Sequence, residues 1–380
     1  MPCIRGKTVY TGTSIVTDGF VAFNGPTVTG VGTKPRGEVL GEYEVITPAF
    51  IDPHCHIGMH RAAEPAAESE SNEKMDPLLT LPDALDSVQM DDAAFGESIE
   101  MGVLYSCVVP GSGNILGGLA AVIRHHAPTT TDALIARAGV KCAFGYNPMS
   151  TGGWKGSRPS TRMGAAALLR GKLDEIRLKM AKRRRATGKA KQDITFTAAE
   201  AILRDVLTGK QRLRCHVHKI DDIAALLRVV DEFKLTVTVE HAADVHDGAI
   251  FAELKRRGIP VVYGPVDSFP YKVELRHASW KNIRLLIDTG VEFGLMTDHP
   301  VTLSRQLLLQ TRWFTRAGLS KQQAIELITR RNAHILGIDD RLGTLKRGRW
   351  ASLVAFNGDP FDITCHPVAV WAEGQRIYTA

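Results

Sequence analysis

The middle of the chain, residues 49–342, alternates short apolar runs with longer segments whose apolar residues recur every three to four positions. The short runs predict buried strands, and the longer segments predict amphipathic helices. Strands that alternate with helices lie parallel in one sheet whose faces the helices cover. About eight such pairs fit into this stretch, so we expect an α/β fold built as a (β/α)8 TIM barrel.

The expected strands are short and rich in Val, Ile, Leu and Phe, and most of them end in polar residues. We place them at residues 47–54, 102–110, 136–140, 141–148, 212–218, 236–241, 260–264 and 292–299. The expected helices lie at residues 166–183, 196–209, 222–233, 248–258 and 320–337. The glycine-rich stretch at 111–118 is expected to be a loop after the second strand.

Both ends of the chain have a different pattern, in which short runs of Val, Ile, Thr, Phe and Tyr are separated by glycine turns. This pattern is typical of small antiparallel strands. We therefore predict one small composite β-sandwich domain built from both termini, residues 1–48 and 343–380, beside a barrel of residues 49–342.

The overall charge excludes few classes of partner, because 47 Lys and Arg against 41 Asp and Glu give a net charge of only +6. The excess is concentrated in residues 170–191, which have ten basic and two acidic side chains. This segment lacks interleaved aromatic residues for base stacking, so we expect a solvated helix end and no nucleic-acid partner. No apolar run reaches the about 18 residues that a membrane span needs. With six scattered cysteines, read as reduced thiols, we expect a cytoplasmic protein with no membrane partner.

Histidine and aspartate residues follow several of the predicted strands at the point where each strand ends. Side chains two positions apart on a strand point the same way, so His54 and His56 are expected to enter one lumen. The carboxyl ends of barrel strands meet at one face, so the side chains that follow them converge. Imidazole and carboxylate groups are ligands that zinc or a similar divalent ion prefers. The full set is His54, His56, His216, His218, His241 and Asp298.

These residues resemble the pattern of the amidohydrolase superfamily, which has HxH after the first barrel strand, a His after the fifth and the sixth, and an Asp after the eighth. The resemblance covers nearly the whole chain and is greatest to imidazolonepropionase-like and prolidase-like members. Supporting stretches include TPAFIDPHCHIG, RCHVHKIDDIAALLRVVDEF, VEHAADVHDG, LMTDHP and GTLKRGRWASLVAFNGDPFD.

The resemblance implies a metal-bound hydroxide that attacks a carbonyl or amidine carbon. It implies His54, His56, His216 and His241 as ligands, and Asp298 as both a ligand and the group that takes the proton of the water. His216 is preferred to His218 because the fifth-strand His of the family usually begins this motif. His218 is left to the substrate or to another metal.

One position departs from the pattern of the family. Many relatives have a Glu or a carboxylated Lys at the end of the fourth strand that bridges two metals, whereas this chain has Tyr146. Lys141 lies five residues earlier, and this odd spacing predicts that it faces the opposite side of the strand. A tyrosine cannot supply a carboxylate at ordinary pH. We therefore predict a site with one Zn²⁺ and Tyr146 as a hydrogen-bond donor to a substrate carbonyl or oxyanion.

Several other polar residues are candidates for substrate binding. Asn114 lies in the glycine-rich loop, and His60 and Arg61 follow the HxH motif closely. Arg162, near the Gly-Trp-Lys-Gly segment at 153–156, and Arg276 could each bind an anion through the guanidinium fork. The sequence does not rank these candidates.

The predicted function is hydrolysis of a C–N bond in an amide, a peptide or an N-acyl amino acid, including a peptide in natural-product maturation. The alternatives are a deaminase or cyclic-amide hydrolase with the same site, and a non-catalytic barrel scaffold. Deaminases of the superfamily commonly have a Glu three residues after the fifth-strand His, where this chain has Lys219. A cationic Lys219 suits a substrate carboxylate instead. The expected partner is a small-molecule or peptide substrate, with a homo-oligomer expected only by analogy.

Overall fold

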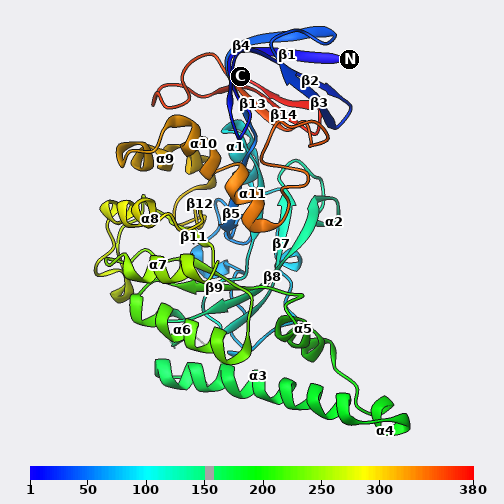
Figure 1. Ribbon diagram of the computed structural model, residues 1–380, viewed down its shortest axis with the longest axis vertical. Helices are drawn as coiled ribbons and strands as arrows, with labels where there is room; N and C mark the ends of the chain where they lie inside the picture. Colours follow the sequence, from blue (N-terminus) through cyan, green and yellow to red (C-terminus); the bar gives the residue numbers. More distant parts are fainter. Residues whose placement is uncertain (150–157) are drawn as a thin grey trace.

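The computed structural model describes residues 1–149 and 158–380, in which two sheets lie one above the other (Figure 1). The larger sheet is the barrel, and the smaller sheet contains both termini. The predicted Gly-Trp-Lys-Gly segment at 153–156 lies outside the described residues.

The barrel sheet has eight strands in the order β12-β11-β10-β9-β8-β7-β6-β5. Its closing gap lies between β12 and β5, where the buried Asn332 donates hydrogen bonds to Leu295 O at 2.9 Å and to Ile51 O at 2.7 Å. The barrel is therefore nearly closed, as predicted, although the last junction is made by a side chain. The strands are β5 (Phe50–Cys55), β6 (Val103–Val108), β7 (Leu116–Arg124), β8 (Leu134–Ala143), β9 (Leu213–Val217), β10 (Val237–His241), β11 (Val261–Tyr263) and β12 (Phe293–Leu295).

The third strand differs from the prediction in position and direction. β7 is antiparallel to both β6 and β8, so this part of the barrel is a pair of hairpins without a crossover helix. The glycines at 117 and 118 suggested a loop, but they begin a buried strand of small residues. The two strands predicted at 136–140 and 141–148 are one strand, β8. The sheet is therefore a mixed α/β barrel.

Helices cover the outer face of the barrel (Figure 1). The predicted helix at 320–337 is two helices, because the chain breaks at Thr329, whose φ and ψ of −129° and −94° are not helical. The helices are α1 (Ala93–Glu100), α2 (Thr130–Ala133), α3 (Arg162–Arg185), α4 (Gly188–Gln192), α5 (Ala198–Leu207), α6 (Ile220–Phe233), α7 (Ala249–Arg256), α8 (Ile283–Thr289), α9 (Leu307–Arg316), α10 (Lys321–Leu327) and α11 (Arg330–Leu336). Short 3₁₀ turns are η1 (Ala66–Glu68), η2 (Ala84–Asp86), η3 (Asn147–Met149), η4 (Val273–Leu275), η5 (Trp280–Asn282) and η6 (Ser304–Gln306).

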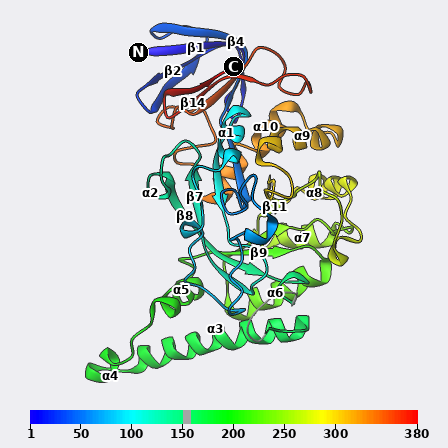
Figure 2. The same cartoon turned by 180° about the vertical axis from the view of Figure 1, so that it is seen from behind.

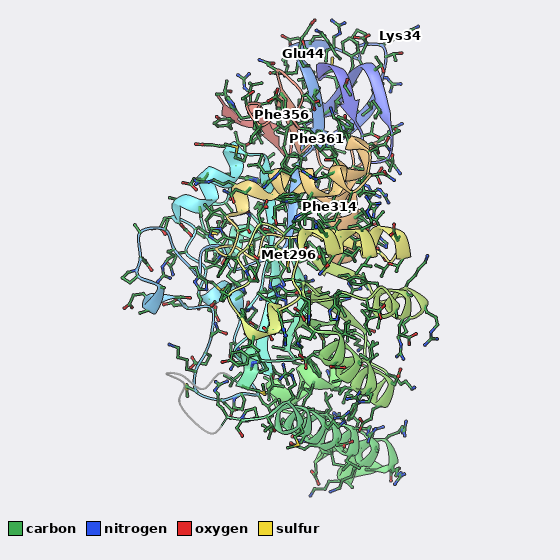
Figure 3. All side chains as sticks on the ribbon, turned by 90° about the vertical axis from the view of Figure 1, so that its left-hand side faces the viewer. Lys34, Glu44, Met296, Phe314, Phe356 and Phe361 are labelled. Atoms are coloured by element: carbon green, nitrogen blue, oxygen red, sulfur yellow. The ribbon has the colours of Figure 1, made fainter. Side chains whose placement is uncertain are left out.

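The smaller sheet joins strands from both ends of the chain, as the sequence predicts. Its order is β15-β14-β13-β4-β1-β2-β3, and the antiparallel pair of β4 and β13 joins the two ends. Phe356 of β13 lies in this upper region, whereas Phe314 of α9 and Met296, which follows β12, lie lower (Figure 3). The strands are β1 (Pro2–Tyr10), β2 (Ile15–Asn24), β3 (Thr27–Gly32), β4 (Glu38–Pro48), β13 (Leu353–Phe356), β14 (Pro367–Ala372) and β15 (Gln375–Thr379). The sandwich arrangement and the exact domain boundaries stay predictions.

The basic segment forms the end of α3 and the short α4, which project from the lower end of the molecule (Figure 2). The last turn of α3 contains four cationic side chains, residues 182–185, where positive charge interacts favourably with the helix dipole. This agrees with a solvated helix end. In the part of the chain that the structure describes, no helix is long and apolar enough to cross a membrane.

Candidate metal centre

Two groups of buried side chains meet at the carboxyl ends of the barrel strands. In the first group, His54 and His56 from β5 and its end lie beside Asp298, which follows β12. The Asp298 Oδ1 atom lies 3.2 Å from His56 Nε2 and 3.5 Å from His54 Nε2. All six predicted side chains thus lie near one another at one end of the barrel.

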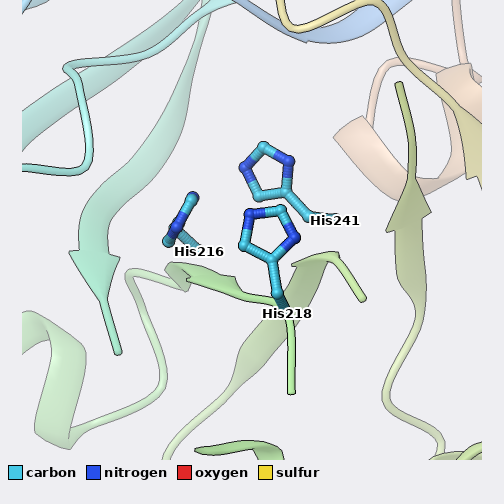
Figure 4. A group of neighbouring side chains, drawn as sticks. All are labelled: His216, His218 and His241. Atoms are coloured by element: carbon cyan, nitrogen blue, oxygen red, sulfur yellow. The ribbon is translucent and has the colours of Figure 1, made fainter. Parts of the chain in front are cut away.

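The second group consists of His216, His218 and His241, which gather around one point at the ends of β9 and β10 (Figure 4). One nitrogen of each of the three rings lies within 4.8 Å of the others. His241 also adjoins the first group, because its ring centre lies 5.0 Å from that of His54 and its Nδ1 lies 3.9 Å from Asp298 Oδ2. The two groups therefore form one continuous site.

The backbone is strained where two of these residues are placed. His241 has a φ of 77° and Asp298 a φ of 52°, a left-handed conformation that is uncommon for residues other than glycine. Such strain persists when surrounding structure fixes it, and it is concentrated at functional sites. Hydrogen bonds from Asp298 N to His54 O, at 3.1 Å, and from His241 Nδ1 to Gly264 O, also at 3.1 Å, hold the two residues.

A buried network of charges lies behind His54. Its Nδ1 contacts the carboxylate of Glu240 on β10, which also pairs with Arg214 of β9 at 2.8 Å. Thr238 donates a further hydrogen bond to Glu240 at 2.8 Å. Burial raises the pKa of Glu240, but Arg214 and His54 more than offset this and hold it below its usual range. The ionised Glu240 accepts the Nδ1 proton and leaves the Nε2 lone pair of His54 facing the site.

Lys141 faces the site, so the prediction that it points away is wrong. Its side chain is fully buried, and its Nζ lies 3.2 Å from His54 Nε2. The alternation argument failed because β8 ends at Ala143 and the chain turns at Gly145, with a φ of 90°. Burial lowers the pKa of Lys141 to about 8, so a fraction of its amine is neutral near physiological pH. The site therefore has a lysine amine from this strand, although the sequence shows no bridging carboxylate at the end of the strand.

Tyr146 has a different environment from the one expected. Its side chain is 42% exposed, and its contact with the site is made by its backbone N–H. This N–H donates a 2.9 Å hydrogen bond to the Oε2 of Glu274. Glu274, which the sequence did not single out, is 1% exposed, and its Oε1 lies 3.5 Å from His216 Nε2 and 3.7 Å from His218 Nε2.

The imidazoles of the second group fit a metal ion. Among the residues that the structure describes, His216 Nδ1, both ring nitrogens of His218 and His241 Nε2 have no hydrogen-bond partner. Burial holds the pKa of all three histidines well below the usual value, so their rings are neutral and can donate a lone pair. A buried ring nitrogen that has neither a hydrogen-bond partner nor a metal ion destabilises the fold. Together with the carboxylate of Asp298, they form a donor set suited to a borderline divalent cation.

The carboxylate of Asp298 is suited to binding a cation. Burial raises its pKa, but the hydrogen bond from His56 and the charges of His54 and Lys141 lower it below its usual range. Its carboxylate is therefore ionised at neutral pH. It can both contact a cation and accept a proton.

Of the predicted substrate residues, His60 lies beside the first group, and Arg61 follows it in the chain. The ring of His60 lies 5.9 Å from that of His56, and its Nε2 lies 2.8 Å from Ser71 Oγ. Arg61 pairs with Glu64 at 2.6 Å. Both residues line a cavity of about 260 Å³ beside His299, so the structure brings them to a hollow next to the site.

Asn114 and Arg162 have structural partners. The buried amide of Asn114 donates hydrogen bonds to Glu73 O at 2.9 Å and Asp76 O at 2.7 Å. Arg162 makes two hydrogen bonds to Asp222, at 2.7 Å and 3.2 Å. Both side chains therefore hold loops or helices together, and their roles in substrate binding stay predictions.

Lys219 and Arg276 are more accessible. Lys219 follows His218, and its Nζ lies 3.7 Å from Asp244. Arg276 is exposed after η4. The sequence missed Glu240, Arg214 and Glu274, because a buried charge on a strand or a distant loop has no short motif. The one available signal was charged residues inside otherwise apolar runs, such as Arg214 in RLRCHVH.

The model of the Amidohydrolase family matches residues 45–379, which is most of the chain. The chain belongs to the Amidohydrolase family. The predicted resemblance is thereby confirmed, as is a hydrolytic enzyme of the class that acts on C–N bonds. Amidohydrolases typically bind a divalent metal, and the two groups described above are its candidate ligands.

Among curated proteins, the amidohydrolase tasK of Hapsidospora irregularis is 24% identical to this chain over 357 residues. The match covers 87% of this chain and 36% of tasK. The chain therefore spans about a third of the length of this relative.

Solved structures of amidohydrolases have the same fold. An amidohydrolase from Thermotoga maritima MSB8 is 29% identical, covers 100% of both chains and has a TM-score of 0.91. A prolidase complexed with N-methylphosphonate-L-proline is 15% identical with a TM-score of 0.64, and guanine deaminase from E. coli is 13% identical with a TM-score of 0.54, each with 100% of both chains covered. At these lower identities, the likeness to the last two concerns the fold alone.

Proposed function

We propose that this amidohydrolase cleaves the C–N bond of a peptide or an N-acyl amino acid by metal-assisted attack of water. The observation that carries the proposal is the position of Asp298, whose carboxylate contacts both His54 and His56 at 3.5 Å and 3.2 Å in a buried site. When bound, a divalent ion such as Zn²⁺ polarises the substrate oxygen and lowers the pKa of water. Asp298 accepts the proton of the water and passes it to the leaving nitrogen.

The side chains around Asp298 have separate tasks in this proposal. Glu240 fixes the His54 tautomer, and the backbone carbonyl of Val109 does the same for His56 through its Nδ1 at 2.7 Å. Both imidazoles then present Nε2 to the ion. The left-handed backbone at Asp298 aims its carboxylate back toward β5. These contacts hold the reacting groups in place before the substrate arrives.

We further propose two ions rather than one. The argument for a single ion depended on the absence of a bridging group, and Lys141 Nζ lies at 3.2 Å from His54 Nε2. Its neutral amine can combine with carbon dioxide to form a carbamate with loss of one proton, which supplies an anionic group at this point. His216 and His241, with neutral rings, would then hold the second ion.

The choice of substrate is based on charge. Lys219 lies after β9 and is 29% exposed, and a cation there suits the carboxylate of a peptide or an N-acyl amino acid. A prolidase, a Xaa-Pro dipeptidase and an ochratoxinase are among the proteins of similar fold. Guanine deaminase also shares the fold, so deamination is the second candidate. Lys219 disfavours it, because a cation cannot act as the carboxylic acid that deamination needs at that position.

The experiment measures metal content and hydrolysis for the wild type and for Asp298→Asn. We expect zinc-like ions in the wild type, hydrolysis of some members of a panel of dipeptides and N-acyl amino acids, and a loss of about 10²- to 10⁴-fold in rate in the variant. Guanine and related amidines are tested in parallel. Protein that takes up no ion after reconstitution would contradict the catalytic proposal and favour a scaffold. Ammonia release from amidines alone would favour the deaminase.

A further inference from the structure

A groove outside the barrel is lined mainly by positively charged side chains. It lies between the second half of α3, α4 and α5, at the lower end of the molecule (Figure 2), and has a volume of about 440 Å³. Among the described residues that line it, none is acidic and five are basic: Arg177, Arg183, Arg184, Lys191 and Arg204. The groove shares no residue with the metal centre, so it is a separate feature of the molecule.

One aromatic ring in the groove holds three cations close together. The ring centre of Phe196 lies 5.4 Å from Lys179 Nζ, and the guanidinium carbons of Arg204 and Arg183 lie 5.5 Å and 5.7 Å from it. Cation–π attraction stabilises each of these contacts. Like charges around a single ring nevertheless repel one another. An anion with several negative charges would remove this repulsion.

Acidic side chains compensate only part of the positive charge. Three of the cations have acidic partners, in the ion pairs Arg177–Asp174, Lys179–Glu200 and Arg204–Asp205. The other three line the groove and form no ion pair within the part of the chain that the structure describes: Arg183, Arg184 and Lys191. The groove therefore keeps three positive charges without a counterion.

The side-chain types and the size of the groove indicate which anion fits. Four of the five lining cations are arginines, whose planar forks bind two phosphate oxygens at once. The volume of about 440 Å³ lies in the range of small-molecule sites, about 300–1,000 Å³. The carboxylates of an acidic peptide are spread along an extended chain at about 3.3 Å per residue, whereas linked phosphates concentrate their charge.

We propose that this groove binds the di- or triphosphate group of a small molecule, carried by a nucleotide or by inorganic polyphosphate. Arg183, Arg184 and Lys191 would contact the phosphates. Phe196 and Met180 supply an apolar wall, against which the base of a nucleotide can pack.

The test compares the double variant Arg183→Gln/Arg184→Gln with the wild type and with Lys182→Gln/Arg185→Gln. The second double variant is a matched control, because it removes the same charge from the same turn of α3, but neither of its side chains lines the groove. Isothermal titration calorimetry measures the binding of ATP and of tripolyphosphate to each protein at low and at raised ionic strength. Metal content is measured afterwards, because polyphosphates also chelate metal ions.

We expect both probes to bind the wild type at one site per chain. Arg183→Gln/Arg184→Gln should weaken binding by at least about tenfold, because charge-assisted hydrogen bonds are lost. The control should weaken it by less than about threefold, because exposed charges away from the ligand are screened. Tighter binding of ATP than of tripolyphosphate would identify a nucleotide, and equal binding would identify the phosphate chain alone as the ligand.

Equal losses in the two double variants would overturn the inference, because binding would then depend on net charge alone. A wild type that binds neither probe would also overturn it. Tighter binding of polyglutamate than of tripolyphosphate would overturn it in favour of an acidic peptide partner. None of these outcomes affects the proposed hydrolysis, because the substituted residues lie outside the metal centre.

Discussion

The two histidine groups differ in what lies behind their imidazoles. In the first group, His54 contacts Glu240, which Arg214 and Thr238 hold, and His56 contacts a backbone carbonyl. In the second group, His241 contacts the carbonyl of Gly264, whereas both ring nitrogens of His218 lack a hydrogen-bond partner among the residues that the structure describes. The first group is therefore ordered by the protein, whereas the second depends more on an ion. Substitution of the residues that support the first group should lower the free energy of unfolding. Substitution of the second group should mainly weaken metal binding.

The largest effect is expected from Glu240→Gln. This change leaves the buried Arg214, which is 1% exposed, without its carboxylate. Removing one partner of a buried ion pair costs about 3–5 kcal/mol of unfolding free energy. The loss of the acceptor for His54 Nδ1 should also weaken metal binding by about 10- to 100-fold. Urea unfolding and metal titration measure the two effects.

The control is Glu42→Gln, which removes one partner of an ion pair at the surface. Arg5 lies 2.9 Å from Glu42, and the two side chains are 37% and 64% exposed, so solvent replaces the lost partner and the cost should stay below about 1 kcal/mol. Equal costs for the two variants would show that the network behind His54 does not order the first group.

The second largest effect is expected on the number of metal ions that each chain binds. Lys141→Met removes the amine that we propose to bridge the two groups, and the ions per chain should fall from two to one. The fold should lose less stability than in Glu240→Gln, because burial lowers the pKa of Lys141 to about 8 and a partly neutral amine leaves less uncompensated charge behind when it is removed. Elemental analysis, with and without added bicarbonate, measures the content. Two tightly bound ions in Lys141→Met would exclude a bridging role.

A smaller effect concerns acid stability without metal. Burial holds the pKa of His218 well below its usual value of 6.5. As the pH falls below 6.5, the unfolded chain binds a proton at this residue and the folded chain does not, so stability falls by roughly 1.4 kcal/mol per pH unit. Between pH 7 and pH 5, His218→Asn should lose about 2 kcal/mol less than the metal-free wild type.

His54→Asn provides the comparison with the first group. Burial lowers the pKa of His54 to about 4, so its contribution to the pH dependence should end near pH 4, whereas that of His218 continues below it. Urea unfolding at several pH values distinguishes the two. Identical profiles for both variants would show that the two groups have the same electrostatic environment.

The sequence predicts well which histidine and aspartate residues form this site. Periodicity and motif spacing place His54, His56, His216, His241 and Asp298 at the ends of strands, and the structure gathers them at one end of the barrel. The same reasoning finds the composite sheet, because glycine turns between short apolar runs have a local signature.

The supporting residues could not be predicted in this way. Glu240 and Arg214 lie on neighbouring strands and pair across the sheet, so their contact depends on strand register rather than on spacing along the chain. Glu274 reaches the second group from a loop whose path no periodicity specifies. β7 was missed for a related reason, because its small residues and paired glycines are also typical of a turn. Lys141 was misjudged by extending the alternation of β8 through the turn at Gly145.

The smallest effect should come from Tyr146→Phe, the residue whose side chain the sequence favoured as a donor. The loss of a true oxyanion donor lowers kcat by about 10²- to 10³-fold. Because the Tyr146 side chain is 42% exposed, we expect less than about a threefold change in rate and no change in metal content. Gly145→Ala, one residue earlier, should instead lower the stability of the fold, because its methyl group would meet Glu274 Oε2 at 2.9 Å and the φ of 90° disfavours residues other than glycine. A rate loss of a hundredfold in Tyr146→Phe would mean that the phenol moves into the site when substrate binds. Otherwise this turn acts on the second group through its backbone.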